Sequence, residues 1–263
     1  MDETNQRPGI KYSKGKYVPT IDSIAVETPL QTTSDRNDGK LYGTLMRTPG
    51  NDLELIVGLM ISSGDLLLNE QIPEINISSN CVHVSISKTK SERLLNSTSS
   101  CGICGRENVE IVPIPDCSTM PKLNIHVDII KKIIKKIGDG QDLFESTGGT
   151  HAAALWDLNG EMLSIMEDVG RHNAFDKLIG HQRIIEKWPM SSCVVSLSGR
   201  ISYEMVEKAI RSNIPILISV GSATTAAIDL ASFHDLSLIV FARDHRFTCM
   251  TGTHRIINAD GVK

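Results

Sequence analysis

The sequence predicts an α/β protein with a smaller N-terminal α+β region and a larger C-terminal layer of strands and helices. Three observations support this class. From residue 146 onward, short apolar segments alternate with helical segments, in the order expected of β-α-β units. The first part of the chain instead pairs β-rich segments around polar turns. Pro113, Pro115 and Pro121 punctuate the chain between the two regions, so we expect a domain boundary near residue 120.

The bulk composition limits the possible functions. The 263 residues are 40% hydrophobic and 22% charged, which permits a substantial core and excludes a disordered or fibrous chain. The formal net charge of −4 argues against a nucleic-acid or membrane-surface partner. No apolar run reaches the roughly 18 residues of a membrane span, and residues 1–17 lack a secretory signal. We therefore expect a cytoplasmic protein with mostly free thiols and a flexible N-terminal tail over residues 1–17.

Residues 18–120 are predicted to form the N-terminal α+β domain. The pattern of β-branched and alternating apolar residues indicates strands at residues 18–30, 40–47 and 82–87. The polar turn at residues 35–39 indicates that the first two strands are antiparallel. A helix opens at residues 51–54 and continues an apolar stripe towards Gly64, where glycine favours its end.

Residues 121–263 are predicted to form the C-terminal domain. Isoleucines at helical spacing, with lysines opposite, indicate an amphipathic helix over residues 124–138. Asn159-Gly160 indicates a hairpin. Further strands are predicted at residues 153–158, 161–166, 193–197, 215–220 and 236–241, and further helices at residues 171–188, 203–211 and 224–233. This order predicts a mostly parallel sheet.

Cys101 and Cys104 are the most informative pair of residues. They lie three positions apart among glycines and serines, which indicates a loop. Two thiols at this spacing can bind a soft metal, form a disulfide or share a mobile sulfur atom. A structural zinc site usually needs a second ligand pair, which the sequence lacks, so reactive thiols are favoured and a zinc clip stays open. Cys193 and Cys249 are interpreted as packing residues.

Polar clusters follow the predicted strands of the C-terminal region. Ligands of open α/β sheets bind beyond the carboxyl ends of strands, where small residues admit a ligand and arginine forks suit phosphate. No Walker A or Rossmann glycine pattern is present. The alternatives are a structural Arg171–Glu167 pair, a core histidine and a helix cap. The candidate ligand-binding residues are Arg171, His172, Ser198, Arg200 and Ser222.

A further polar segment follows the last predicted strand. It brings two arginines and a histidine to one predicted turn, which suits an anionic ligand. An exposed polar hairpin is the alternative. The residues of this segment are Phe241, Ala242, Arg243, Asp244, His245 and Arg246.

Together these residues resemble the FdhD-type formate dehydrogenase accessory sulfurtransferases. The likeness runs from about Ile24 to Ile256, and the stretch EDVGRHNAFDK at residues 167–177 is its most specific part. The other matching stretches are residues 100–105, 147–151, 198–205 and 241–246.

The resemblance implies a sulfur carrier. Such proteins take persulfide sulfur from a cysteine desulfurase and pass it to the molybdenum cofactor, bis(molybdopterin guanine dinucleotide), before its insertion into formate dehydrogenase. Carried over, Cys101 bears the persulfide, Cys104 is its partner, and residues 241–246 bind the cofactor. The resemblance also implies a homodimer and a cytidine-deaminase-like, three-layer α/β/α C-terminal domain. The nucleotide pyrophosphates of such a cofactor would suit the polar clusters, and Arg106 can lower a thiol pKa.

The competing hypothesis is a non-catalytic cofactor-binding chaperone in which the CxxC is a structural or metal-binding clip. A thiol-disulfide oxidoreductase is disfavoured because the residues after Cys104 do not clearly open a helix. After Arg246 the sequence continues Phe-Thr-Cys-Met-Thr, which departs from the family's usual polar-aromatic strand. Cofactor contacts are therefore expected only as far as Arg246, and we expect no metal held by the protein itself.

Overall fold

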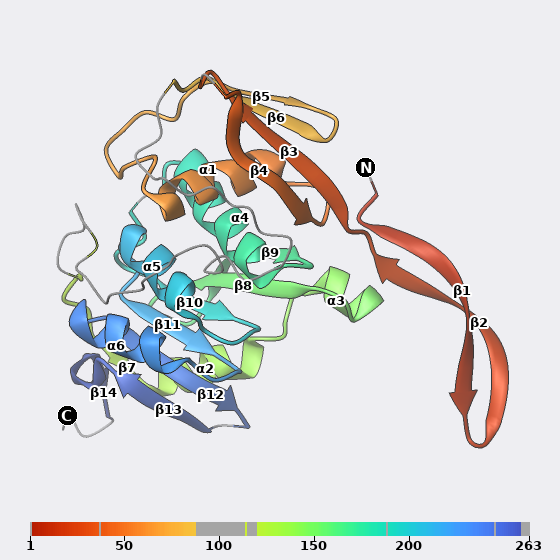
Figure 1. Cartoon of the computed structure of the whole chain (residues 1–263). Coiled ribbons are helices and arrows are strands. Elements are labelled where there is room, and N and C mark those ends of the chain that lie inside the picture. Colours follow the sequence, from red (N-terminus) through yellow and green to blue (C-terminus); the bar gives the residue numbers. More distant parts are fainter. Residues whose placement is uncertain are drawn as a thin grey trace.

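The structure is a computed structural model that describes residues 2–36, 38–87, 114, 120–187, 189–244 and 246–258. Within these ranges the chain forms an α/β fold with six α-helices and four sheets, which confirms the predicted class (Figure 1). No helix in these ranges is long and apolar enough to cross a bilayer.

A six-stranded sheet lies at the centre of the C-terminal region, in the order β13-β12-β11-β10-β8-β9. Its strands are β8 (His151–Trp156), β9 (Met162–Asp168), β10 (Val194–Leu197), β11 (Ile216–Ser219), β12 (Ser237–Arg243) and β13 (Arg246–Thr251). Among the described strands of this sheet, only β10, β11 and β12 pair in parallel. The predicted mostly parallel sheet is therefore wrong: β8 runs antiparallel to β10, and the β8–β9 and β12–β13 hairpins add antiparallel edge strands.

Helices cover both faces of this sheet (Figure 1). One face carries α4 (Arg171–Ile184), α5 (Tyr203–Arg211) and α6 (Thr225–Phe233), and the other carries α2 (Val127–Lys136). Successive strand residues point to opposite faces, so Val195 and Leu197 join the core under α4–α6 whereas Val194 joins the core under α2. The sheet is thus the middle of three layers.

The described part of the N-terminal region combines one helix with a four-stranded sheet in the order β4-β3-β6-β5. Its elements are β3 (Thr28–Ser34), β4 (Lys40–Arg47), α1 (Asp52–Ser63), β5 (Ile75–Ser78) and β6 (Cys81–Val84). Helix α1 ends at Gly64, whose φ of 82° is left-handed, as the sequence predicted. Smaller elements are β7 (Ile125–His126), α3 (Asp142–Thr147), β14 (Ile256–Ile257) and the 3₁₀ helix Thr253–Arg255.

The chain begins with a β-hairpin of β1 (Thr4–Ser13) and β2 (Lys16–Ala25) that extends away from the body of the protein (Figure 1). A flexible tail was expected over residues 1–17, whereas in the structure these residues include β1 and the start of β2. Lys14 and Gly15 have φ values of 50° and 79°, and such a two-residue left-handed turn matches the twist of antiparallel strands. Sequence reasoning missed the signal because lysine rarely adopts this conformation.

Helices α1 and α4 cross in direct backbone contact. A Cβ atom added at Gly58 would lie 1.8 Å from the carbonyl oxygen of Asp176, and one added at Gly180 would lie 1.9 Å from that of Glu54. Because of this approach, apolar side chains of α1, α4 and the central sheet form one core. The N- and C-terminal regions share that core, and the domain boundary near residue 120 stays a prediction.

Buried ion pairs reinforce this junction. Lys177 Nζ lies 2.8 Å from the Asp168 carboxylate and donates to the carbonyl oxygen of Thr48 at 3.0 Å. The preceding residue of α4, Asp176, accepts hydrogen bonds of 2.6 Å from both Lys208 Nζ and Ser62 Oγ. Charges removed from water are stable only with such partners, so these contacts fix how α4 meets the N-terminal region.

Replacing Gly58 by Ala should destabilise the protein by about 3 kcal/mol or more, because overpacking against backbone leaves no side chain to move aside. Chemical denaturation followed by circular dichroism measures the loss. Gly138→Ala is the matched control, since a Cβ there meets nothing within 4 Å and the backbone is not left-handed. Equal stability of the two variants would contradict the close crossing.

Candidate functional site

The polar clusters that follow the strands of the C-terminal region lie at one edge of the six-stranded sheet. The carboxyl ends of β9, β10, β11 and β12 and the start of β8 all lie there. Arg171 and His172 follow β9, Ser198 and Arg200 follow β10, and Ser222 follows β11. The turns after β10 and β11 are in contact, since the Ile201 N–H donates to the carbonyl oxygen of Ser222 at 2.9 Å. The sequence-predicted residues are therefore neighbours along one edge.

Ser219 ties these two turns together. Its buried hydroxyl donates to the carbonyl oxygen of Gly199 at 2.6 Å and accepts from the Gly221 N–H at 2.9 Å. A Cβ atom at Gly221 would lie 3.2 Å from the backbone nitrogen of Arg200, so glycine permits the close approach of the two turns. Sequence reasoning missed Ser219, although a hydroxyl residue at the end of an apolar strand was a usable signal.

His151 begins β8 and faces the turn after β10. Its Nδ1 lies 3.2 Å from Ser198 Oγ, which also accepts the Ala152 N–H at 2.9 Å. Burial, followed by the positive charges of Arg171 and His172, lowers the pKa of His151 below its ordinary value. When the ring is neutral, Ser198 can donate its proton to Nδ1, which leaves Nε2 as the donor nitrogen. The site thus contains a histidine suited to donating a hydrogen bond without carrying charge.

Arg171 and His172 have different surroundings. A Cβ atom at Gly199 would lie 3.3 Å from Arg171 Cδ and 3.4 Å from His151 Cε1, so both side chains line the backbone of that turn. The Nε of Arg171 is buried without a hydrogen-bond partner among the described residues. His172 Nε2 lies 3.1 Å from the Glu204 carboxylate and 3.3 Å from Ser202 Oγ. An unpartnered buried donor at this edge indicates a place for an acceptor ligand.

The rest of the 167–177 stretch is structural. The expected alternative of an Arg171–Glu167 pair is not among the contacts of Glu167, whose carboxylate accepts the N–H groups of Leu143 and Phe144 and the Thr150 hydroxyl. Asn173 Nδ2 donates to Asp168 and to the carbonyl oxygen of Met46. Most of the stretch therefore joins the two regions of the chain, and Arg171 and His172 alone in it border the candidate site.

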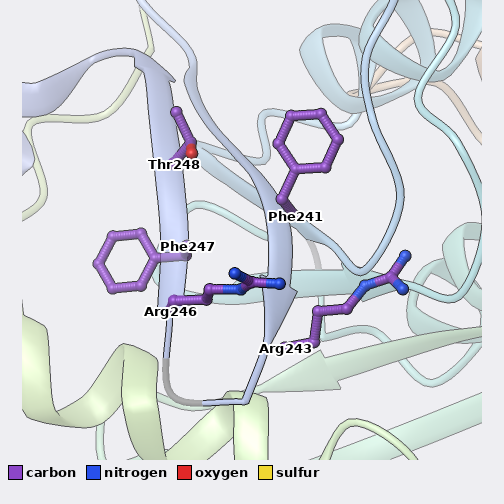
Figure 2. A pocket seen from close by; sticks show the side chains of 5 residues that line it. All are labelled: Phe241, Arg243, Arg246, Phe247 and Thr248. Carbon is purple, nitrogen blue, oxygen red and sulfur yellow. The ribbon is translucent and has the colours of Figure 1, made fainter.

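A cavity of about 470 Å³ lies over the β12–β13 hairpin (Figure 2). The predicted turn is shorter than expected, because Phe241 and Arg243 belong to β12 and Arg246 already belongs to β13. Ala242 was expected to bind the cofactor; its side chain is fully buried in the core under α2, so only its backbone can contribute to a site there. His245 lies outside the described residues. The cavity is lined by Phe241, Arg243, Arg246, Phe247 and Thr248.

Phe241 is held in an unusual backbone conformation. Its φ of 53° is left-handed, and it lies where the β12–β13 register shifts. The Phe241 N–H donates to the carbonyl oxygen of Gly221 at 2.9 Å, and the Arg243 guanidinium donates to that of Val220 at 2.9 and 3.1 Å. These bonds link the cavity to the turn after β11. Phe241 is 47% exposed, and Figure 2 shows its side chain on β12.

The CxxC cysteines and the two cysteines expected to pack in the core have different standing. Cys101 and Cys104, together with Arg106, lie outside the described residues. Cys193 and Cys249 are half-buried and pack against the cores, and burial raises the pKa of both thiols. A raised pKa lowers the thiolate fraction, which agrees with the packing role expected for these two residues.

The fold and this edge define an α/β protein whose strand ends form an arginine- and histidine-rich candidate site. The FdhD/NarQ family model matches residues 25–257, and the chain belongs to this family. The chain is 37% identical to the sulfur carrier protein FdhD of Sulfurisphaera tokodaii, over 90% of this chain and 92% of that one. It is also 37% identical to the protein of that name from Sulfolobus acidocaldarius, over 94% and 96%.

A crystal structure has the same fold. It is of a Desulfotalea psychrophila protein assigned as a formate dehydrogenase accessory protein, with a TM-score of 0.77 and 24% sequence identity. The match covers 97% of this chain and 100% of that chain.

The pKa of His151 should rise when Arg171 is replaced by Gln, because a neighbouring positive charge is removed, but burial should keep it below 6.5. Nuclear magnetic resonance titration of the imidazole measures the shift. Arg200→Gln is the control, since Arg200 is not among the charges that shift this pKa. In the unaltered protein, the stability contributed by the neutral ring should be lost as pH falls from 6.5 through the lowered pKa. A histidine that titrates at 6.5 would contradict this geometry.

Proposed function

We propose that this protein is the sulfur carrier, and sulfurtransferase, that formate dehydrogenase requires. It receives persulfide sulfur from a cysteine desulfurase on Cys101, with Cys104 as the partner thiol. It delivers that sulfur to the molybdenum cofactor, bis(molybdopterin guanine dinucleotide), before the cofactor enters formate dehydrogenase. Family membership and the names of the relatives support the sulfur-carrier role. The proposal further includes a cytoplasmic homodimer and a cytidine-deaminase-like C-terminal region.

One observation supports cofactor binding most directly. The cavity lined by aromatic and arginine residues lies at the same sheet edge as the polar turns. The cavity of about 470 Å³ has the size of a small-ligand pocket, typically about 300–1,000 Å³. The exposed ring of Phe241 can stack on a base, and the exposed guanidinium of Arg246 can pair with phosphate oxygens. The unpartnered Nε of Arg171 suits a second acidic group of the same extended ligand.

The sulfur step needs no outside oxidant. The Cys101 thiolate attacks the outer sulfur of the desulfurase persulfide, and a new S–S bond forms. The old S–S bond breaks, and its electron pair leaves on the desulfurase cysteine as a thiolate. Arg106, which follows the CxxC in sequence, can favour the attacking thiolate.

Incubation with a cysteine desulfurase and cysteine should add about one sulfur atom to the protein, and Cys101→Ala should abolish the gain. Intact-mass spectrometry followed by peptide mapping measures both. Cys249→Ala is the control and should retain the sulfur, because burial raises the pKa of that thiol. No sulfur on Cys101 or Cys104 with an active desulfurase, together with stoichiometric zinc, would favour the cofactor-binding chaperone instead.

Guanosine diphosphate should bind the unaltered protein, and Arg246→Ala should weaken that binding roughly 10- to 100-fold, as expected for loss of a charge-assisted hydrogen bond. Titration calorimetry measures the affinity. Arg36→Ala, in the β3–β4 turn, removes an arginine outside the cavity and should leave the affinity unchanged. An equal loss of affinity in both variants would mean that only the net charge of the protein matters. Absence of binding to the unaltered protein would contradict the nucleotide assignment.

A further inference from the structure

The β1–β2 hairpin has one apolar face and one polar face. Residues directly opposite each other in an antiparallel pair point to the same side. The register therefore puts three apolar pairs on one face: Pro8 with Ile21, Ile10 with Pro19, and Tyr12 with Tyr17.

The opposite face is polar and charged. It carries the pairs Arg7 with Asp22, Gly9 with Thr20, and Lys11 with Val18. Since every charged residue between positions 7 and 22 other than the turn residue Lys14 falls on this face, the hairpin is amphipathic with a period of two.

The apolar face is open to solvent in the single chain. Ile10 is 73% exposed, Tyr12 63%, Tyr17 77% and Ile21 71%. Figure 1 shows the hairpin reaching away from the body. Its base is closed by the Val26 N–H, which donates to the carbonyl oxygen of Glu3, and there β2 contacts α3. An isolated two-stranded hairpin is marginally stable in water, and so large an exposed apolar face indicates an interaction surface.

The chemistry of this face favours a second copy of the same chain as its occupant. Interfaces of homodimers are more apolar than those of transient complexes, and their centres lack charged residues. The six residues of this face include no charge. The four large side chains together expose roughly 600 Å², which approaches the roughly 800 Å² per partner of a standard interface. A face without charge can also meet its own copy across a two-fold axis without repulsion.

We propose that the apolar face of the β1–β2 hairpin, made by Pro8, Ile10, Tyr12, Tyr17, Pro19 and Ile21, is the surface through which two copies of this chain associate. The inference gives a surface to the homodimer included in the proposed function, and it does not depend on sulfur transfer. Each copy contributes the same face, so a single substitution changes both halves of the interface.

Sedimentation equilibrium of the full chain tests the proposal with Ile10→Asp and Lys11→Asp. These neighbours lie on opposite faces of the same strand, so both variants place a new carboxylate at the same level of the hairpin. The unaltered protein and Lys11→Asp should be dimers with similar dissociation constants. Ile10→Asp should raise the constant at least roughly 30-fold, the loss expected at the centre of an interface.

Hydrogen exchange provides a readout that does not use a variant. Backbone amides of residues 4–25 in the unaltered protein should exchange more slowly at high than at low concentration, because association stabilises the hairpin. A protein that is monomeric at all concentrations overturns the proposal, as does a dimer that Ile10→Asp leaves unchanged. Loss of the dimer in both variants would also overturn the assignment to the apolar face. Sulfur loading in the same samples separates these outcomes from failure of the proposed function.

Discussion

The contact between α1 and α4 is the constraint on which the rest of the structure depends. The two helices meet backbone to backbone at Gly58 and Gly180, and a methyl group at either position would overlap a carbonyl oxygen of the other helix. This crossing presses α1 against the helix layer that also covers the central sheet. It also brings Thr48 and Ser62 to the buried charges of Lys177 and Asp176. The N-terminal region therefore supports the helix layer that packs on the central sheet, although its described residues supply no side chain to the cavity.

At the candidate site, too, few side chains determine the positions of several backbone segments. Ser219 sets the positions of two turns with one hydroxyl, and the Phe241 N–H binds the second of these turns to the cavity. Backbone groups thus set the shape of the candidate site, and in the proposed function His151, Arg171 and Arg246 provide the donors. The left-handed φ of Phe241 costs conformational energy that neighbouring hydrogen bonds offset, which is typical of residues held ready for a partner.

Local signals in the sequence predicted much of the fold. Helix α5 lies at residues 203–211 as its amphipathic pattern indicated, and α1 ends at Gly64 as glycine favours. Strand direction was harder, because the same apolar segment can pair either way and hydrogen bonds to distant strands decide. The edge location of Arg171 and Ser198 followed from topology alone. The burial of Ala242 and the structural role of Asp168 did not, because both depend on contacts far away in sequence.

The buried charges of α4 also bear on how this chain can change over evolutionary time. Lys177 and Asp176 have partners both before and after the prolines at residues 113–121, so buried charges in one region depend on residues of the other. Recombination that exchanged one region for that of a distant relative would leave buried charges without partners, unless the partner residues were exchanged as well. Surface loops face no such restriction. Diversification of this chain is therefore expected at its periphery, with the two halves inherited together.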